Sequence, residues 1–275
     1  MTAFDHTYET LDVTTPSPGV AHLRLDRRTE LNAITPTVLD DLDDVLDDLD
    51  DAADADGSTG PADAHDVPVL VVSGAGRAFS VGADLDLIDG LDAGRAADLS
   101  RRGQRVFGRL SALPAPVVAA IDGYCLGGGM ELAACADIRI ASPDATFGQP
   151  ECDRGLVPGW GGTQRLARLV GRGRAAEVIL TADEYDAETM HRYGFVTELA
   201  DDPLDRARER AGAFADRSPG VNRDAKRALG HDDAAAGLAF EAAAFGRLAA
   251  RRGTGSDGSN GDDPESAAGP GDGGG

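Results

Sequence analysis

The sequence predicts an α/β fold followed by an all-helical C-terminal part, and three observations support this prediction. Short apolar segments of strand length alternate with segments of helical periodicity between residues 19 and 200. The strand segments run into glycine-containing turns before the next helix, as expected for crossover connections in an α/β domain. From Asp205 to Arg252 the chain is rich in Ala, Arg and Asp and carries only helical patterns. Periodicity alone does not separate a doubly wound sheet from a spiral of successive ββα turns.

The first elements are a strand, a long helix and a second strand. Residues 19–27 alternate apolar and polar side chains, which predicts a half-buried strand. Residues 31–57 carry apolar side chains at steps of three and four, which predicts an amphipathic helix with an aspartate-rich outer face. Its apolar positions are Leu39, Leu42, Val45, Leu46 and Leu49. Residues 54–66 are expected to form a mobile acidic insertion, and residues 67–76 a buried strand ending in a glycine turn.

The middle of the chain repeats the pattern of strand, glycine turn and helix. Residues 78–91 are expected to turn into a helix with Asp84 as its N-cap. A further helix covers residues 101–113 and stops at Pro114. The remaining elements are a strand with a glycine loop at 115–129, a helix at 130–136, a strand with a turn at 137–151, and two helical pieces closing with a short strand at 161–200.

The chain is predicted to have three parts. Residues 1–200 form the α/β core, residues 201–252 a helical region, and residues 253–275 a disordered, acidic, glycine-rich tail with almost no apolar side chains. No apolar run approaches 18 residues, so a membrane span is not expected. The start, MTAFDHTYETLDV, has neither a basic nor an apolar signal-peptide region, which predicts a cytoplasmic protein.

The charge balance is strongly acidic. Twenty-six basic residues face 48 acidic ones, which gives a net charge of −22. Aspartate outnumbers glutamate 37 to 11, and Lys226 is the single lysine. Such a surface repels nucleic acid and, in dilute buffer, repels itself. Because the Debye length is only about 3 Å in 1 M salt, we hypothesise that the protein works in a high-salt cytosol, as in a halophile.

The cysteines and histidines do not indicate a disulfide framework or a metal site. Cys125, Cys135 and Cys152 are odd in number and fit no common zinc spacing, so free thiols are expected. The five histidines are scattered and form no HExxH-like pattern. No metal is therefore predicted.

Two glycine-containing loops are the first candidates for function. Residues 74–86 (GAGRAFSVGADLD) and 123–132 (GYCLGGGMEL) each place small residues where a strand gives way to a helix. Such a junction leaves backbone N–H groups without partners, and glycine lets a ligand approach them closely. One N–H from each loop can bind one developing negative oxygen, as in an oxyanion hole. The loops match neither a P-loop nor GxGxxG in the required context, and the alternative of simple tight turns stays open.

Two glutamates lie next to glycine turns. Glu131 stands just inside a helix start and is surrounded in sequence by small apolar residues. Glu151 follows the loop FGQPE and precedes a further glycine-rich turn. Paired carboxylates in a dry pocket can divide acid and base roles, because burial and mutual repulsion raise their pKa values. The alternative is a capping role for Glu131 and a surface loop position for Glu151.

Five segments together resemble the enoyl-CoA hydratase/isomerase (crotonase) superfamily. The resemblance runs from about Gly19 to Lys226, apart from residues 54–66. The segments are LNAITPTVLDDL, VVSGAGRAFSVGADL, PVVAAIDGYCLGGGMELAACADIRIAS, ATFGQPECDRGLVPGWGGTQRLARLVG and YGFVTELA. The resemblance implies a crotonase-like spiral of ββα units and a helical C-terminal region that takes part in trimerisation, with trimers commonly pairing into hexamers.

The resemblance also implies the chemistry. Family members bind acyl-CoA thioesters and stabilise a thioester enolate with two backbone N–H groups, which match Ala83 and Gly128. In the hydratases two glutamates act on water and on the C2 proton; Glu131 and Glu151 occupy those positions. The implied reaction is reversible syn-addition of water to a trans-2-enoyl-CoA, with no cofactor beyond the coenzyme A of the substrate. The implied substrate contacts are Ala83, Asp84, Leu85, Gly128, Pro150 and Trp160.

Two alternative functions and two departures from the family pattern remain open. A Δ3,Δ2-enoyl-CoA isomerase is the alternative within the fold, although family isomerases typically lack the carboxylate matching Glu131. A non-catalytic acyl-CoA-binding subunit is the alternative from another class. Asp86 stands where many members carry a cation suited to the CoA phosphates, so other Arg residues or Lys226 are the remaining candidates for that contact. Trp160 stands where a smaller residue is common and either shapes the acyl pocket or only packs.

Overall fold

The computed structural model describes residues 5–55, 67–217, 220–231 and 233–254. The chain divides into two compact units at Lys226 and Arg227, and each is described by itself. Within the described residues, seven strands of the first unit form a sheet in the order β1-β2-β3-β4-β6-β8-β11. Their bounds are His6–Thr7, Leu11–Ser17, Val20–Leu25, Val69–Gly74, Val117–Ile121, Ile138–Ala141 and Glu198–Leu199. The strands β3, β4, β6, β8 and β11 run parallel, and β1 and β2 are antiparallel to their neighbours.

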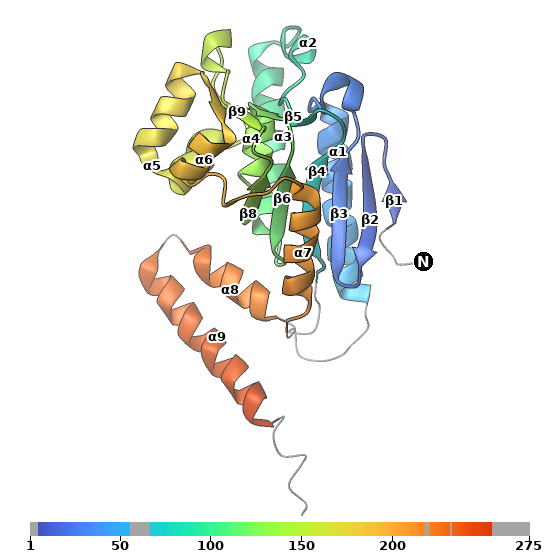
Figure 1. The fold of residues 1–275 in the computed structure, drawn as a ribbon, viewed down its shortest axis with the longest axis vertical. Helices are drawn as coiled ribbons and strands as arrows, with labels where there is room; N and C mark the ends of the chain where they lie inside the picture. The colour runs from blue at the N-terminus through green and yellow to red at the C-terminus, as the bar shows by residue number, and fades with distance from the viewer. Residues whose placement is uncertain (1–4, 56–66, 218–219, 232, 255–275) are drawn as a thin grey trace, which may run out of the picture. The chain divides into compact units, whose positions relative to one another are not determined.

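A second, four-stranded sheet has the order β10-β9-β7-β5 within the same described part of the chain. Its strands are β5 (Ala78–Ser80), β7 (Tyr124–Leu126), β9 (Thr146–Gly148) and β10 (Glu184–Asp186). Each strand pair of the core therefore divides its two members between the sheets: β4 and β5, then β6 and β7, then β8 and β9. A helix follows each pair, so the chain winds as a spiral of ββα units (Figure 1). The α/β prediction and its spiral form are confirmed, and the doubly wound alternative is wrong.

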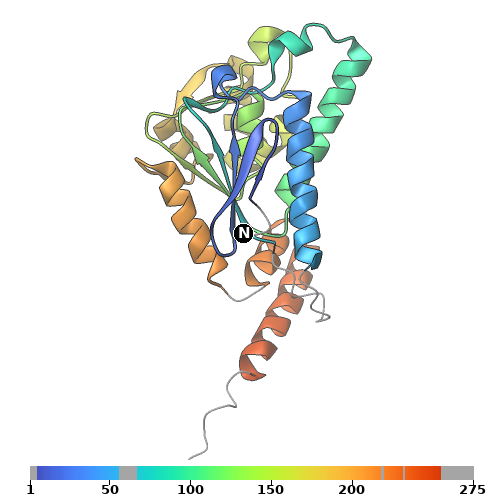
Figure 2. The same cartoon turned by 90° about the vertical axis from the view of Figure 1, so that its right-hand side faces the viewer.

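The helices of the first unit cover both faces of the large sheet. They are α1 (Pro36–Ala55), α2 (Leu85–Ile88), α3 (Ala93–Ala112), α4 (Gly128–Ala133), α5 (Gly162–Thr181), α6 (Ala187–Tyr193) and α7 (Pro203–Ala215), with 3-10 turns at Arg28–Glu30 and Cys152–Arg154. Figure 2 shows α1 and α7 on opposite sides of the sheet. Because strand side chains alternate, Leu70 and Val72 of β4 join the core under α1 and α3, whereas Val69 and Val71 pack with Ala207 of α7.

Several boundaries differ from the sequence-based expectation. The strand β2 was not predicted, because its sequence LDVTTPS is polar after Val13; antiparallel pairing with β3 forms it. The first helix begins at Pro36 rather than near residue 31, since Leu31 and Asn32 have φ values of 53° and 56°. The segments 115–129 and 137–151, each expected to hold one strand, contain two strands in different sheets. The helix expected from residue 101 begins at Ala93, where the Asp92 side chain caps it.

Other expectations are confirmed or fall outside the described residues. The five apolar positions predicted for the first helix are buried. Cys125, Cys135 and Cys152 are free thiols. Asp84 takes the N-cap position of α2, although its side chain makes no capping hydrogen bond. Residues 56–66 of the expected insertion and 255–275 of the expected tail lie outside the described residues.

The C-terminal helices are α8 (Val221–Leu229), which contains the boundary between the units, and α9 (Ala234–Thr254). Within the second unit the Arg227 guanidinium lies 4.8 Å from the centre of the Phe240 ring, and His231 packs beside the same ring at 5.5 Å. Across the described ranges, none of the helices combines the length and apolar character required to cross a bilayer.

Candidate active site

The candidate site forms where three parallel strands of the second sheet end. The strands β5, β7 and β9 are neighbours, so the loops that leave their carboxyl ends meet at one edge of the sheet. The register pairs Leu126 with Gly148, and the Gly127 N–H donates to the Gly148 carbonyl at 2.8 Å. This pairing brings the glycine loop after β7 beside the loop that carries Glu151. The spiral thus joins segments that are separated by tens of residues in sequence.

One pocket of 230 Å³ takes residues from all three loops. Ala83, Gly128, Glu131 and Glu151, the four residues predicted to carry the chemistry, line it together. Leu85, Pro150 and Trp160, three of the further predicted substrate contacts, also line it. The remaining wall is largely apolar and comes from α2, α3 and the segment after Arg154; it includes Ile88, Leu91, Ala96, Leu99, Leu156 and Val157. The pocket is therefore a mostly apolar cavity with two carboxyl groups at one end.

Two backbone N–H groups of the pocket are available to a ligand. Gly128 is the first residue of α4, and the first N–H groups of a helix have no acceptor within it. Ala83 forms a β-bridge with Ile34, but its own N–H takes no part in it. The Ile34 N–H donates to the Gly82 carbonyl, and the Asp84 N–H donates to the Ile34 carbonyl. Gly127 has a φ of 52°, and a Cβ at Gly82 would lie 2.5 Å from the Gly128 nitrogen. Glycine is thus required where the two loops approach each other.

The loop that carries Ala83 is held in place by Asn32. Its side-chain amide donates to the Ala75 carbonyl at 3.0 Å and to the Ala78 carbonyl at 2.7 Å. The Ser80 hydroxyl donates to the Asn32 carbonyl at 2.7 Å and accepts from the Gly82 N–H at 3.1 Å. Sequence reasoning did not single out Asn32 or Ser80, although both stand in segments that carry the family resemblance. Their role depends on a contact across almost fifty positions.

Glu131 is buried, with only 2% of its surface exposed. Its Oε1 accepts hydrogen bonds from the Trp160 N–H at 2.8 Å and from the Gly162 N–H at 2.6 Å. Burial raises the pKa of Glu131 above its ordinary value, and the two N–H groups oppose that rise without cancelling it. The Glu131 side chain does not cap its own helix: its carboxylate reaches Trp160 and Gly162, the first residue of α5.

Glu151 is partly buried beside the glycine loop. A Cβ at Gly127 would lie 2.9 Å from its Oε1, so the loop passes directly beside the carboxylate. Burial raises the pKa of Glu151 to about 7; the Glu131 charge adds to the rise and Arg154 opposes it. With its NH₂ turned toward this carboxylate, the buried Gln149 amide donates to Oε2 at 2.9 Å and to Oε1 at 3.1 Å. Gln149 was also missed, although it stands in the FGQPE segment.

Two residues considered for the substrate lie elsewhere. Asp84, a predicted substrate contact, takes the N-cap position of α2 and is not among the residues that line the pocket. Lys226, considered for the CoA phosphates, binds Asp137 at 2.8 Å and the Ala115 carbonyl at 3.0 Å. These partners precede β8 and β6, at the amino ends of the strands. Lys226 therefore ties α8 to the sheet edge opposite the carboxyl ends that lead to the pocket.

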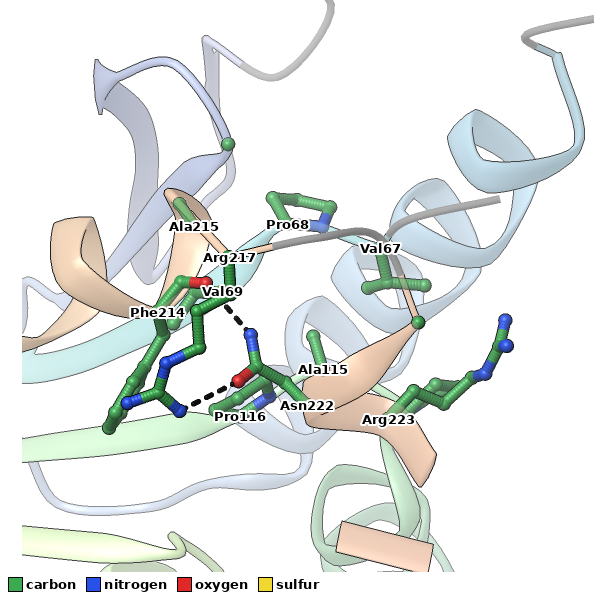
Figure 3. A pocket seen from close by; sticks show the side chains of 13 residues that line it. Val67, Pro68, Val69, Ala115, Pro116, Phe214, Ala215, Arg217, Asn222 and Arg223 are labelled. Carbon is green, nitrogen blue, oxygen red and sulfur yellow. Dashed lines mark hydrogen bonds between the residues drawn. The ribbon is translucent and has the colours of Figure 1, made fainter. Parts of the chain in front are cut away.

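A second pocket, of 130 Å³, lies at the amino ends of β3, β4 and β6. Figure 3 shows the Arg217 guanidinium donating to the Asn222 side chain, at 3.0 Å, while the Asn222 amide donates to the Phe214 carbonyl at 2.8 Å. The Arg217 guanidinium also lies 4.7 Å from the centre of the Phe214 ring. None of the described residues that line it carries a carboxylate, so this pocket lacks the paired acid and base of the first.

The first pocket combines the groups needed for chemistry next to a carbonyl. Two N–H donors can hold a carbonyl oxygen as it becomes negative, which lowers the barrier to forming an enolate. Glu151, whose pKa burial raises to about 7, can give and take a proton near neutral pH, and burial raises the pKa of Glu131 as well. Among the described residues no cluster of three or more His, Cys, Asp or Glu side chains is suited to hold a metal ion.

Comparisons with known proteins agree with this geometry. The family model described as enoyl-CoA hydratase/isomerase matches residues 15–252. The chain is 39% identical over 197 residues to the crotonyl-CoA hydratase of Syntrophomonas wolfei, covering 70% of this chain and 76% of the relative. It is 39% identical over 187 residues to the short-chain-enoyl-CoA hydratase of Clostridium acetobutylicum, covering 66% and 72%.

A solved structure shows the same fold. The crystal structure of an enoyl-CoA hydratase from Bacillus anthracis superposes with a TM-score of 0.78 at 30% sequence identity, covering 90% of this chain and 96% of that one. The family match covers most of the chain, and the relatives share more than a third of the aligned residues. The chain therefore belongs to the enoyl-CoA hydratase/isomerase family.

Proposed function

We propose that the protein is an enoyl-CoA hydratase, which adds water reversibly and with syn geometry to a trans-2-enoyl-CoA to give a 3-hydroxyacyl-CoA. The observation that carries this proposal is the placement of two carboxyl groups of raised pKa, Glu131 and Glu151, in the pocket that also contains the Ala83 and Gly128 N–H groups. An isomerase that moves one proton along the chain needs a single acid–base group. A second buried carboxylate is explained by the need to activate water.

In the proposed mechanism the thioester oxygen lies between the Ala83 and Gly128 N–H groups. Donors of this kind typically stabilise a transition state by about 3–4 kcal/mol each. Glu131 accepts a proton from the water that attacks C3, and Glu151 donates a proton to C2. The two hydrogens and the oxygen of one water are thereby accounted for. No metal or redox group is required, because the thioester itself lets negative charge move onto its oxygen.

The two carboxyl groups share one proton throughout the cycle. Hydration starts with Glu151 protonated and Glu131 ionised, and dehydration starts with the reverse arrangement. Both states hold the same number of protons, and the overall reaction neither releases nor consumes H⁺. The pair therefore titrates as a unit, and its apparent pKa values belong to both residues.

A bell-shaped pH profile is the expected result for kcat/KM. Above about pH 7 the pair loses its shared proton, since burial holds the pKa of Glu151 at about 7, and activity falls about tenfold per pH unit. At acid pH both carboxyls are protonated and activity falls again. Initial rates of crotonyl-CoA hydration, measured across pH, check this profile. A kcat/KM that does not fall above about pH 7 would contradict the shared proton.

The function is tested with two substrates in multimolar KCl. Crotonyl-CoA is expected to lose its conjugated enoyl absorbance as water adds. 3-Hexenoyl-CoA is the matched isomerase substrate and is expected to react much more slowly. Fast conversion of the 3-enoyl substrate without any hydration of 2-enoyl substrates would make the protein an isomerase and would overturn the proposal.

The proposal extends to assembly and location. The second unit exposes the apolar side chains of Leu229 (87%), Leu238 (65%) and Phe245 (74%), and exposed apolar side chains on a helix are typical of an interface. We expect these helices to form the contacts of a homotrimer, or of a hexamer built from two trimers, in the cytoplasm. Light scattering after gel filtration measures the mass, and a stable monomer in high salt would contradict the proposed assembly.

A further inference from the structure

The indole of Trp160 forms part of the pocket wall, against Gly128. Trp160 is 5% exposed and lines the cavity beside Gly128 and Glu131. Its own backbone N–H is one of the two donors that hold Glu131 Oε1. The ring is thus tied to the residue proposed to activate water at C3.

Two glycines form a slot for this ring. A Cβ at Gly103 of α3 would lie 2.2 Å from the Trp160 Cδ1, on the five-membered side of the indole. A Cβ at Gly128 would lie 2.4 Å from Cζ3, on the six-membered side. Real Cβ atoms do not approach so closely, so both positions must lack a side chain for the indole to fit. The ring therefore fills the space between α3 and the start of α4.

Phe107 fixes the ring from a further direction. It lies one helical turn after Gly103 and meets the indole edge-on, with ring centres 5.6 Å apart and planes at 74°. A ring held by two backbone segments and an aromatic neighbour cannot rotate away without disturbing the core. The Trp160 side chain is therefore a fixed wall of the cavity rather than a movable lid.

The remaining cavity is small for a long acyl chain. Its volume is 230 Å³, below the range of about 300–1,000 Å³ that is usual for sites enclosing drug-sized ligands. Leu85, Ile88, Leu91 and Leu99 line it on the side of α2 and α3, and Leu91 and Leu99 also line a neighbouring hollow. We propose that Trp160 limits the acyl chain and makes the enzyme selective for short-chain enoyl-CoA thioesters. This inference rests on the proposed hydratase function.

The test compares kcat/KM for crotonyl-, 2-hexenoyl-, 2-octenoyl- and 2-decenoyl-CoA in the native protein and in Trp160→Leu and Trp160→Phe. In the native protein kcat/KM is expected to fall at least about tenfold from the shortest to the longest substrate. Trp160→Leu is expected to raise the ratio of 2-decenoyl-CoA to crotonyl-CoA at least about tenfold, with a smaller rise for Trp160→Phe. Calorimetric binding of the matching saturated acyl-CoA series, which has neither a double bond to hydrate nor a hydroxyl to eliminate, gives the same comparison without turnover. The Phe variant decides the case if the Leu variant does not fold.

Two alanine substitutions on α3 provide a matched pair. Gly103→Ala places a methyl group against the indole, so it is expected to disturb the native chain-length profile but to be tolerated in Trp160→Leu. Gly108→Ala lies on the same helix, where a Cβ would meet nothing within 4 Å, and is expected to leave the profile unchanged.

The outcomes separate this inference from the proposed function. If the native protein hydrates no enoyl-CoA of any length, the proposed function fails. If it hydrates all lengths with equal kcat/KM, or if Trp160→Leu lowers every substrate by the same factor, the hydratase assignment stands and the role of Trp160 in selectivity is overturned.

Discussion

Replacing Glu151 with Gln is expected to lower kcat for hydration of crotonyl-CoA by about 10³–10⁴-fold, at the upper end of the usual effect of a general acid. The amide keeps the size of the side chain but cannot deliver the proton that C2 requires. The pKa of Glu151, raised to about 7 by burial, is what makes the carboxyl group a proton donor at neutral pH. Steady-state kinetics in high KCl measure the loss, and circular dichroism verifies the fold.

The Glu131→Gln variant separates the roles of the two carboxyl groups. It is expected to abolish hydration as severely, since the water at C3 loses its base. It should nevertheless retain exchange of a C2 proton of butyryl-CoA with deuterated solvent, which needs only Glu151 and the oxyanion hole. Glu151→Gln is expected to lose both activities, and Glu184→Gln, at an exposed position of β10, neither. Exchange lost in Glu131→Gln but kept in Glu151→Gln would reverse the two roles, and undiminished turnover in both would refute them.

A second large effect is expected from salt. The melting temperature should rise steeply between dilute buffer and multimolar KCl, and activity should appear only in the salt. The net charge of −22 repels itself over a Debye length of about 30 Å at 0.01 M, and over only about 3 Å at 1 M. Scanning calorimetry against KCl measures the change, with sucrose as a non-electrolyte control. Full stability in salt-free buffer would contradict the hypothesis of a high-salt cytosol.

The helix α1 shows where part of this repulsion arises. Its exposed side chains Asp40, Asp44 and Asp48 follow one another at four-residue steps, a spacing at which like charges destabilise a helix. Arg102 pairs with Asp40 and the Tyr8 hydroxyl donates to Asp48, which offsets part of this repulsion at the two ends of the row. Asp44→Asn is therefore expected to lower the KCl concentration needed for folding. Asp41 is the contrast: it is buried and accepts hydrogen bonds from the Thr10 N–H and hydroxyl, both at 2.7 Å. Asp41→Ala should destabilise the protein at every salt concentration.

The sequence by itself determined the elements whose burial pattern is local. The apolar steps of α1, the buried run of β4 and the glycine turns all reappear, because periodicity records which side of an element faces the core. Motif resemblance also placed Ala83, Gly128, Glu131 and Glu151, and these four residues line one pocket. Local pattern and motif were therefore enough to indicate the fold, the family and the chemistry.

The tertiary structure alone decided what those residues touch. Three features depend on contacts between distant segments. The strands β6 and β7 belong to different sheets, Trp160 and Gly162 hold the Glu131 carboxylate, and Gly103 makes room for an indole 57 positions away. Lys226 likewise proved to bind Asp137 at the opposite edge of the sheet. Periodicity shows which face of a helix or strand is buried, but it does not show which segment packs against that face. The packing segment is selected by side-chain packing and hydrogen bonding across the whole core. The sequence places Glu131 locally, but its carboxylate can be buried only because the folded chain brings two N–H groups to it.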